Sequence, residues 1–532
     1  MIPVIDLFAG PGGLGEGFSS IVRKDGERTF KIKLSIEKDE HAHRSLELRA
    51  FFRQFPVGQA PEDFYEYLAA KITRQELFDR HRQAARLAAN EAWCAELGSP
   101  LTKDFTVDER IQAARGSRKS WVLIGGPPCQ AYSLVGRSRL IGSVQKAEGK
   151  RSEEGNLAHE ARRKKYEADP RHELYKHYLR ILAVHRPPVF VMENVKGLLS
   201  AKLKEEHIFD RILGDLADPA AAMPEAAVED VKYELVPLAS EGLALPGARD
   251  PEDFVVRAEN YGVPQARHRI IIVGVRADIG GTLGTLPLGR RFTVKEAIGD
   301  LPRLRSGLSK EADTPEAWVK AVREIAKAPW LSDKRIPERV RTRIASGVCH
   351  VHTDLERGDR FISHLAIPQR EFEWFYDSRL SGVCDHESRG HIRSDLHRYF
   401  FAAIFASVMG RSPLLEDFPK ALLPDHRNVE DALKETKFND RFRVQLPDRP
   451  STTVVSHIAK DGHYYIHHDS SQCRSLTVRE AARLQTFPDN YHFEGPRTEQ
   501  YKQVGNAVPP LLARQIAEIV AKLLRPELQG KG

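Results

Sequence analysis

Short apolar runs recur along the first part of the chain and alternate with stretches long enough to form helices. The runs cover residues 4–8, 32–36, 122–124, 189–192 and 270–275, and a helix-length segment such as 174–184 separates neighbouring runs. Short buried strands that alternate with helices are typical of a mostly parallel, doubly wound sheet. The pattern therefore predicts an α/β fold for this part of the chain.

Residues suited to ligand binding or catalysis follow four of these runs. Glycines come after the first run, Glu37 after the second, Cys129 after the third and Glu193 after the fourth. Because the carboxyl ends of parallel strands meet at one edge of a sheet, we expect these residues to converge there.

Arg267 and Arg269 precede their run instead of following it. They reach the same edge if residues 270–275 run antiparallel, paired with residues 233–238. The sequence thus predicts one reversed strand near the edge of the sheet.

The alternation fades after about residue 302, which predicts a second domain. Regular signals return at 475–480, where Thr477 and Glu480 have the spacing of a capping box, and a last helix is expected from Pro509-Pro510 to about Leu524. We expect a catalytic domain over 1–304, a second domain over 305–440, and a segment over 441–532 that completes the first.

Two insertions interrupt the first domain. Residues 41–120 are rich in Ala, Glu and Arg and are expected to be helical, whereas 134–172 is expected to be a long loop. The loop carries many Lys and Arg residues. That charge fits either contact with phosphates or a solvated disordered loop, and the sequence leaves both open.

The composition bounds the class of protein. The 532 residues are 41% hydrophobic and carry a net charge of +7, which permits a polyanionic partner without requiring one. Five scattered cysteines predict free thiols in a reducing compartment. No apolar run approaches a membrane span, and a strand so close to residue 1 leaves no room for a signal peptide, so we expect a cytoplasmic protein.

A glycine-rich turn follows the first apolar run. Gly10, Gly12 and Gly15 have GxGxxG spacing between a strand and a helix, and Glu37 ends the next strand. Glycines allow a ligand to approach the backbone, and the acidic side chain can accept hydrogen bonds from ribose hydroxyls. This pattern predicts a nucleotide cofactor but does not separate a nicotinamide cofactor from S-adenosylmethionine.

Cys129 lies in the turn Gly-Gly-Pro-Pro-Cys-Gln, directly after the third run. Taken alone, a cysteine after such a turn is more often a buried structural residue than a nucleophile. The other motifs of the chain reverse that preference.

Six blocks in order make the chain resemble the DNA (cytosine-5)-methyltransferases: residues 6–18, 126–130, 193–197, 265–269, 476–488 and 503–510. The resemblance covers residues 1 to about 300 and about 440 to 525. It implies a Rossmann-like, S-adenosylmethionine-dependent methyltransferase sheet, mostly parallel with one antiparallel strand, and a smaller inserted target-recognition domain over 305–440.

The resemblance also implies the catalytic residues. Cys129 matches the thiolate that adds to C6 of cytosine, so that C5 can attack the methyl group of the cofactor. Glu193 matches the carboxyl group that binds the N3 and N4 edge of the base. Arg267 and Arg269 match arginines that hold the base and the active-site loop.

The cofactor site is implied in the same way and involves S-adenosylmethionine and no metal. The implied contacts come from Phe8, Gly10, Gly12, Gly13, Glu37, Pro127, Asn506 and Val508. We find no segment between Glu37 and Pro127 that matches the family's adenine contact, and we leave that contact unassigned.

Two groups of Cys and His, at 349–352 and at 384–391, suggest a zinc site at first sight. Their spacing is irregular and lacks a CxxC pair, so packed or DNA-facing residues are favoured over zinc.

The resemblance implies double-stranded DNA as the partner, bound as a monomer, with the target cytosine flipped out and the loop after Cys129 entering the gap. We expect a bacterial or phage-related modification enzyme, cytoplasmic and nucleoid-associated, paired with a cognate restriction or defence nuclease. The alternatives are a tRNA cytosine-5 methyltransferase and a catalytically silent DNA-binding protein on the same scaffold.

Overall fold

The computed structural model describes residues 1–128, 173–200, 202–203, 206–239, 250–364, 373–424 and 439–524. Cys129 and the predicted loop at 134–172 lie outside the described residues.

The largest element is an eight-stranded sheet in the order β3-β2-β1-β4-β5-β11-β8, with β9 also paired to β11. The first five strands are parallel, and β11 runs antiparallel to β5, β8 and β9. The predicted fold class, the reversed strand and its pairing with β8 are therefore confirmed. The strands are β1 (Ile2–Leu7), β2 (Phe30–Glu37), β3 (Ala92–Cys94), β4 (Val122–Gly125), β5 (Val189–Val195), β8 (Tyr233–Pro237), β9 (Val255–Arg257) and β11 (His268–Arg276).

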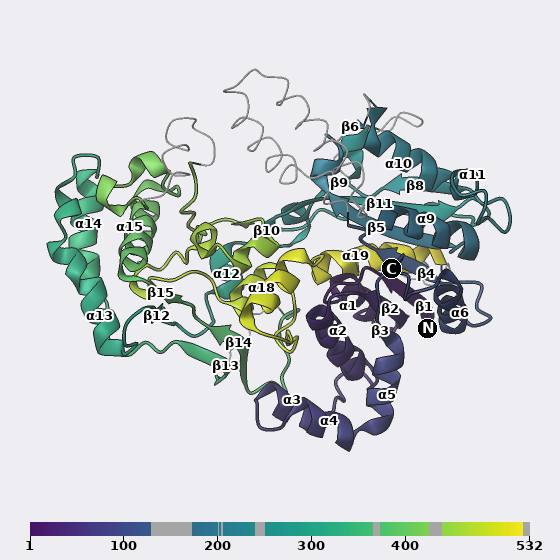
Figure 1. Ribbon diagram of the computed structural model, residues 1–532, viewed down its shortest axis with the longest axis horizontal. Helices are drawn as coiled ribbons and strands as arrows, with labels where there is room; N and C mark the ends of the chain where they lie inside the picture. The colour runs from purple at the N-terminus through teal and green to yellow at the C-terminus, as the bar shows by residue number, and fades with distance from the viewer. Residues whose placement is uncertain are drawn as a thin grey trace.

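Helices cover both faces of this sheet (Figure 1). One face packs against α1 (Gly13–Ser19) and α19 (Pro510–Leu524), and the other against α6 (Asp104–Arg115), α9 (Glu173–His185) and α10 (Ile208–Ala217). The last helix is confirmed, and through it the end of the chain completes the core of the first domain.

The insertion after β2 is mostly helical, as predicted. Its helices are α2 (Glu40–Arg53), α3 (Glu62–Leu68), α4 (Arg74–Arg80) and α5 (Arg82–Glu91). The prediction was wrong for β3, which extends the sheet beside β2. A three-residue strand is too short to show an alternating pattern, so its pairing with β2 decides its conformation.

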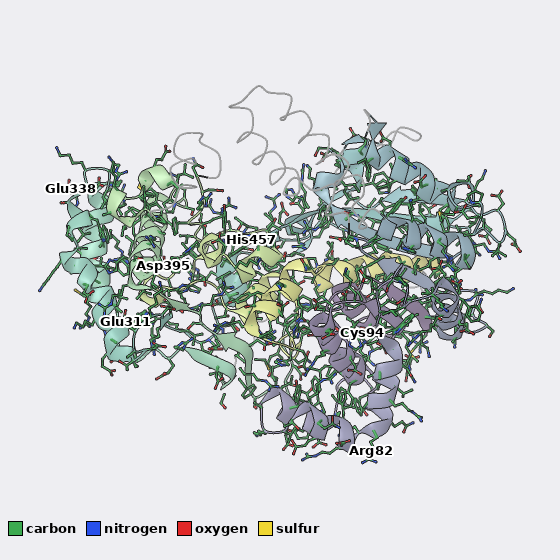
Figure 2. The ribbon with its side chains drawn as sticks, viewed as in Figure 1. Arg82, Cys94, Glu311, Glu338, Asp395 and His457 are labelled. Atoms are coloured by element: carbon green, nitrogen blue, oxygen red, sulfur yellow. The ribbon has the colours of Figure 1, made fainter. Side chains whose placement is uncertain are left out.

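A second core lies at the far end of the molecule and draws on residues from Leu308 to Cys473. It is built around α13 (Pro315–Arg323), α14 (Glu338–Val348) and α15 (Arg393–Met409). Glu338, at the start of α14, lies at the end opposite to the large sheet (Figure 2). The N-cap of α15 is Ile392, which makes no side-chain hydrogen bond, so the packing of its apolar residues in this core stabilises the helix rather than a cap.

A third core lies between these two parts. It contains α12 (Val294–Ile298), α17 (Val478–Leu484) and α18 (Arg497–Asn506). The capping box of α17 is confirmed, since the Glu480 amide donates to Thr477 Oγ1 at 3.2 Å and the Thr477 amide donates to Glu480 Oε2 at 2.7 Å.

The remaining short elements are the helix α11 (Pro219–Ala222) and four strand pairs. The pairs are β6 (Lys202–Leu203) with β7 (Glu206–His207), β10 (Gln265–Ala266) with β16 (Ser451–Thr452), β12 (Gly307–Leu308) with β15 (Gly390–His391), and β13 (Gly358–Ser363) with β14 (Gly382–Glu387). Among the described helices, none is long and apolar enough to cross a membrane.

Candidate functional site

A tight turn connects β1 to α1. Phe8, Gly10 and Gly12 have positive φ angles of 56°, 55° and 93°. Glycine adopts such angles readily, whereas a bulky residue such as Phe8 adopts them only at a cost in free energy. The strain at Phe8 is typical of a functional turn, and its side chain lines the cavity described below.

Glu37, at the end of β2, is fixed beneath this turn. Its Oε2 accepts a hydrogen bond from the Gly10 amide at 2.7 Å, and its Oε1 accepts one from the Asp39 amide at 2.8 Å. Burial raises the pKa of Glu37 above its ordinary value. Asp39 in turn caps α2 by accepting hydrogen bonds from two of its amides.

The C-terminal segment closes over the same turn. A Cβ added to Gly13 would lie 2.2 Å from the carbonyl oxygen of Val508, so only glycine permits this approach. Asn506, the last residue of α18, precedes this contact.

A second group of residues lies at the ends of β4 and β5. Glu193 Oε1 is 2.9 Å from Arg269 Nε on β11, and both side chains are largely buried. Asn194 Nδ2 donates to the Pro127 carbonyl at 3.2 Å, which orients the Pro127-Pro128 turn beside Glu193.

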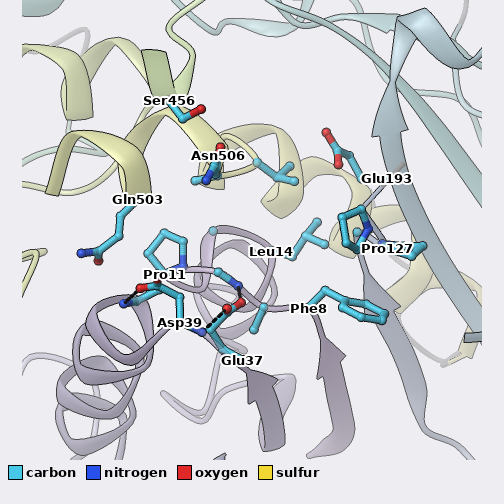
Figure 3. Close-up of a pocket in the computed structure, with 18 of the residues that line it drawn as sticks. Phe8, Pro11, Leu14, Glu37, Asp39, Pro127, Glu193, Ser456, Gln503 and Asn506 are labelled. Carbon is cyan, nitrogen blue, oxygen red and sulfur yellow. Dashed lines mark hydrogen bonds between the residues drawn. The ribbon is translucent and has the colours of Figure 1, made fainter. Parts of the chain in front are cut away.

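A cavity of 530 Å³ joins the two groups. Figure 3 shows Glu37 near one end and Glu193 near the other, with Asn506 and Ser456 contributed by the C-terminal elements. Of the predicted site residues, these line the cavity: Phe8, Gly10, Gly13, Glu37, Pro127, Glu193, Arg267, Arg269, Asn506 and Val508.

Two predicted site residues are not among this lining. Cys129 lies outside the described residues, although Pro128, to which it is bonded, lines the cavity. Gly12 is the N-cap of α1, and a Cβ added there would lie 2.7 Å from Leu46 Cδ1, so it serves the packing of the turn against α2.

The two arginines have different partners. Arg267 is fully buried and donates hydrogen bonds to the carbonyl oxygens of Val454 at 2.7 Å, Gly505 at 3.2 Å and Ala507 at 2.9 Å. Arg269, in contrast, pairs with Glu193. The structure therefore connects Arg267 to the C-terminal segment and Arg269 to the carboxylate in the cavity.

The residues after β3 line the cavity and were missed by the sequence reasoning. Ala95 donates its amide to the Glu37 carbonyl at 3.0 Å, which brings Glu96 and Leu97 to the Glu37 end of the cavity. Glu96 pairs with Lys38 at 2.8 Å. Because β3 itself leaves no periodic signal, the sequence offered no means of finding these residues.

Further lining residues come from the C-terminal elements and were also missed. They are Ser456, Glu499, Lys502 and Gln503. Glu499 and Lys502 form an ion pair of 2.7 Å on one face of α18.

The suggested zinc residues have other environments. Cys349 is exposed at the end of α14, whereas Cys384 is buried in β14. His386 has Thr477 Oγ1 and the Pro302 carbonyl as hydrogen-bond partners. Within the described residues, no group of three or more His, Cys, Asp or Glu side chains is arranged to hold a metal ion.

The sequence is similar to proteins of one known family. The sequence profile of the C-5 cytosine-specific DNA methylases matches residues 106–219 and 253–522. A type II methyltransferase of Bacillus paralicheniformis, M.Bpa9945I, is 32% identical over 541 residues, which cover 98% of this chain and 99% of that protein.

More distant relatives agree with this match. The type II methyltransferase M.AgeI of Thalassovita gelatinovora is 25% identical and covers 97% of this chain and 98% of its own length. The DNA (cytosine-5-)-methyltransferase M.ApeKI of Aeropyrum pernix is 27% identical over 76% of this chain and 81% of its own length.

Proposed function

The chain belongs to the C-5 cytosine-specific DNA methylase family, and from that premise we propose that it transfers a methyl group from S-adenosylmethionine to C5 of a cytosine flipped out of duplex DNA. The observation that carries the proposal is the single cavity with two chemically different ends. A glycine turn and Glu37 form one end, suited to a nucleoside, and the Glu193–Arg269 pair forms the other, suited to a base.

The residues present fit the proposed cofactor. Glu37 is already oriented by two backbone amides, and its position at the end of β2 suits hydrogen bonds to ribose hydroxyls. The backbone at Gly10 and Gly13 gives access without side-chain bulk. Glu96 and Leu97 line the same end of the cavity as Glu37, and we assign to them the adenine contact that the sequence left open. When bound, the cofactor supplies an electrophilic methyl group on a sulfonium.

The chain's own residues carry the remaining steps of the proposed reaction. The Cys129 thiolate forms a bond to C6 of the cytosine, which makes C5 nucleophilic enough to take the methyl group. Water or hydroxide then takes the C5 proton, the electron pair of that C–H bond restores the C5–C6 double bond, and the C6–S bond breaks to release the thiolate while the N3 proton returns to Glu193. Glu193 holds the N3 and N4 edge and delivers a proton at N3, which offsets the negative charge as the ring accepts the sulfur.

Arg269 supports Glu193 in this scheme. Its guanidinium orients the carboxyl group and adds positive charge near the developing anion. Arg267 instead holds the C-terminal elements that carry Asn506 and Val508.

The wider biology is proposed on the same premise. Residues 305–440 would read the DNA sequence, and the basic segment 134–172 would contact the strand around the flipped base. The family is that of cytosine-specific DNA methylases, and M.ApeKI is named a DNA (cytosine-5-)-methyltransferase, which favours DNA over tRNA as the substrate. The designation of M.Bpa9945I as type II supports a companion restriction nuclease, and we propose a cytoplasmic, nucleoid-associated monomer.

Transfer of labelled methyl from S-adenosylmethionine to unmethylated duplex DNA tests the function. We expect Cys129→Ala to abolish transfer, while Arg82→Ala, which changes an exposed residue at the start of α5 and outside residues 305–440, retains it. Base-resolution sequencing should locate 5-methylcytosine at one recurring site. Full activity in Cys129→Ala, or methyl transfer to RNA in preference to DNA, would contradict the proposal.

A further inference from the structure

A contact between α3 and residues 373–387 joins the helical insertion to the proposed recognition region. Figure 1 shows α3 beside the hairpin of β13 and β14. These segments are about three hundred residues apart in sequence, and the contact adds a non-covalent connection between the first domain and the part that is proposed to read DNA.

The contact has an apolar component. Cys384 of β14 belongs to the same buried cluster as Phe64 and Leu68 of α3, and Phe361 and Leu380 pack against that cluster. The recognition region therefore shares part of its core with an insertion in the first domain.

Asp377 is the centre of the polar component. Its Oδ2 accepts hydrogen bonds from the Tyr65 hydroxyl at 2.8 Å and from Asn490 Nδ2 at 2.6 Å, and its Oδ1 accepts one from the Arg379 amide at 3.0 Å. The Arg379 guanidinium lies 4.5 Å from the centre of the Tyr65 ring. We call Tyr65, Asp377, Arg379 and Asn490 the Asp377 junction.

The junction connects to the back of the glycine turn. Asn490 Oδ1 accepts a hydrogen bond from Arg49 Nη1 at 3.0 Å, and Arg49 Nε donates to Glu16 Oε2 of α1 at 2.8 Å. The next residue, Tyr491, donates its hydroxyl to the Pro11 carbonyl. An unbroken series of hydrogen bonds thus runs from the start of α1 to the recognition region.

We propose that the Asp377 junction fixes the orientation of residues 305–440 relative to the cavity, and that Asp377 is thereby a positioning residue for methyl transfer to DNA. The inference rests on the proposed function. A carboxylate that accepts hydrogen bonds from both sides defines one arrangement of the two parts, because each bond is directional and charge-assisted. Without it, a smaller fraction of the protein would hold the two parts in the arrangement that binds DNA productively, and the apparent affinity for DNA would fall in proportion.

Tyr65→Phe tests the proposal with the removal of a single hydroxyl group. Tyr175→Phe is the matched control, because it also removes one hydroxyl group, whose hydrogen bond to the Ile212 carbonyl lies in the first domain and outside the junction and residues 305–440. On an unmethylated plasmid that the wild type methylates, we expect Tyr65→Phe to raise KM for DNA about tenfold, the effect typical of a lost hydrogen bond to a charged group. We expect kcat at saturating DNA, Kd for S-adenosylmethionine and the activity of the control to be unchanged.

Three outcomes would overturn the inference. They are a wild-type KM for DNA in Tyr65→Phe, an equal rise of KM in the Tyr175→Phe control, and a parallel loss of cofactor affinity, which would indicate general loosening of the fold. Absence of methyl transfer by the wild type would instead overturn the proposed function.

Amide hydrogen exchange tests the junction without the need for activity. In Asp377→Ala, we expect faster exchange over residues 373–387 and around α3, with unchanged exchange in β1, β4 and β5. Exchange at wild-type rates in both segments would show that the junction does not hold the two parts together.

Discussion

At the scale of single residues, Asp6 is a carboxyl group whose pKa departs strongly from its ordinary value although Asp6 does not line the cavity. It lies in β1, directly before the glycine turn, and is fully buried. Burial raises the pKa of Asp6 to about 8, even though Arg53 acts in the opposite direction. Asp6 is therefore largely protonated in the folded protein at neutral pH, whereas in the unfolded chain it is ionised.

This difference predicts how stability changes with pH. Because the folded state holds the proton more tightly than the unfolded state, the contribution of Asp6 to stability is fully present below about pH 4 and is lost as the pH rises towards 8. Asp6→Asn removes the titration and keeps the shape of the neutral side chain. We expect the variant to gain in Tm over the wild type as the pH is raised from 5 to 8.

Scanning calorimetry at both pH values measures this gain. Asp354→Asn, an exposed carboxylate in the second core region, is the control and should change Tm equally at the two pH values. A constant offset between Asp6→Asn and the wild type across this range would show that Asp6 does not titrate in it.

At the scale of elements, the contact between α1 and α19 holds the cofactor turn against the end of the chain. It depends on Gly17, because a Cβ added there would lie 2.5 Å from Ala513 Cβ and 2.5 Å from the Pro510 carbonyl oxygen. Helices can approach this closely only where the facing residue is small, so substitution should push α19 away from the sheet.

Gly17→Ala should therefore destabilise the protein by about 1–3 kcal/mol, the usual cost of overpacking. Gly214→Ala in α10 is the matched control, since a Cβ there would have no atom within 4 Å. Alanine favours helix over glycine, so the control should gain up to about 1 kcal/mol. Opposite shifts of Tm are the expected result, and a neutral or stabilising Gly17→Ala would contradict the packing argument.

The same scale explains which elements the sequence predicts. β1, β2, β4, β5 and β11 appear as apolar runs because both faces of each strand are covered by helices. β3 cannot be predicted, because three residues are too few to show a periodic pattern of apolar positions, and its conformation comes from pairing with β2. A strand that is buried on both faces can be predicted from its own apolar residues. A short strand that forms only because it pairs with a neighbouring strand cannot.

Some residues of the candidate site could be predicted from the sequence and others could not, for the same reason. Glu37, Glu193, Gly10 and Gly13 could be predicted because each lies at or after the end of a recognisable strand, and they do line one cavity. The different partners of Arg267 and Arg269 could not, since two residues of one type on one strand look equivalent until their neighbours are known. Glu96 was missed because it follows the strand that has no signal.

At the scale of the whole molecule, the cavity is complete only when the C-terminal segment is attached to the sheet. Segments that surround residues 454 and 505–507 return from beyond the second core to reach the cavity. Arg267 provides much of that attachment, because one buried guanidinium satisfies three backbone carbonyls in two separate segments. Gln265 adds to it by donating to the Leu484 carbonyl at 3.0 Å.

Arg267→Met preserves most of the volume but removes the donors to the buried carbonyls of Val454 and Gly505, whereas the Ala507 carbonyl keeps a hydrogen bond from Gln485 Nε2 at 2.6 Å. Each carbonyl that loses its donor costs about 1–3 kcal/mol, so we expect a large fall in Tm together with faster hydrogen exchange around residues 454 and 505–507. Arg82→Ala, at the exposed start of α5 (Figure 2), should leave both unchanged. Arg267 also lines the cavity, so a loss of activity alone would not tell whether it holds the C-terminal segment or contacts the substrate. The free energy of unfolding does distinguish these two roles. If Arg267→Met lost methyl transfer but kept the wild-type Tm and exchange rates, then Arg267 would act on the substrate and the C-terminal segment would be held by other contacts.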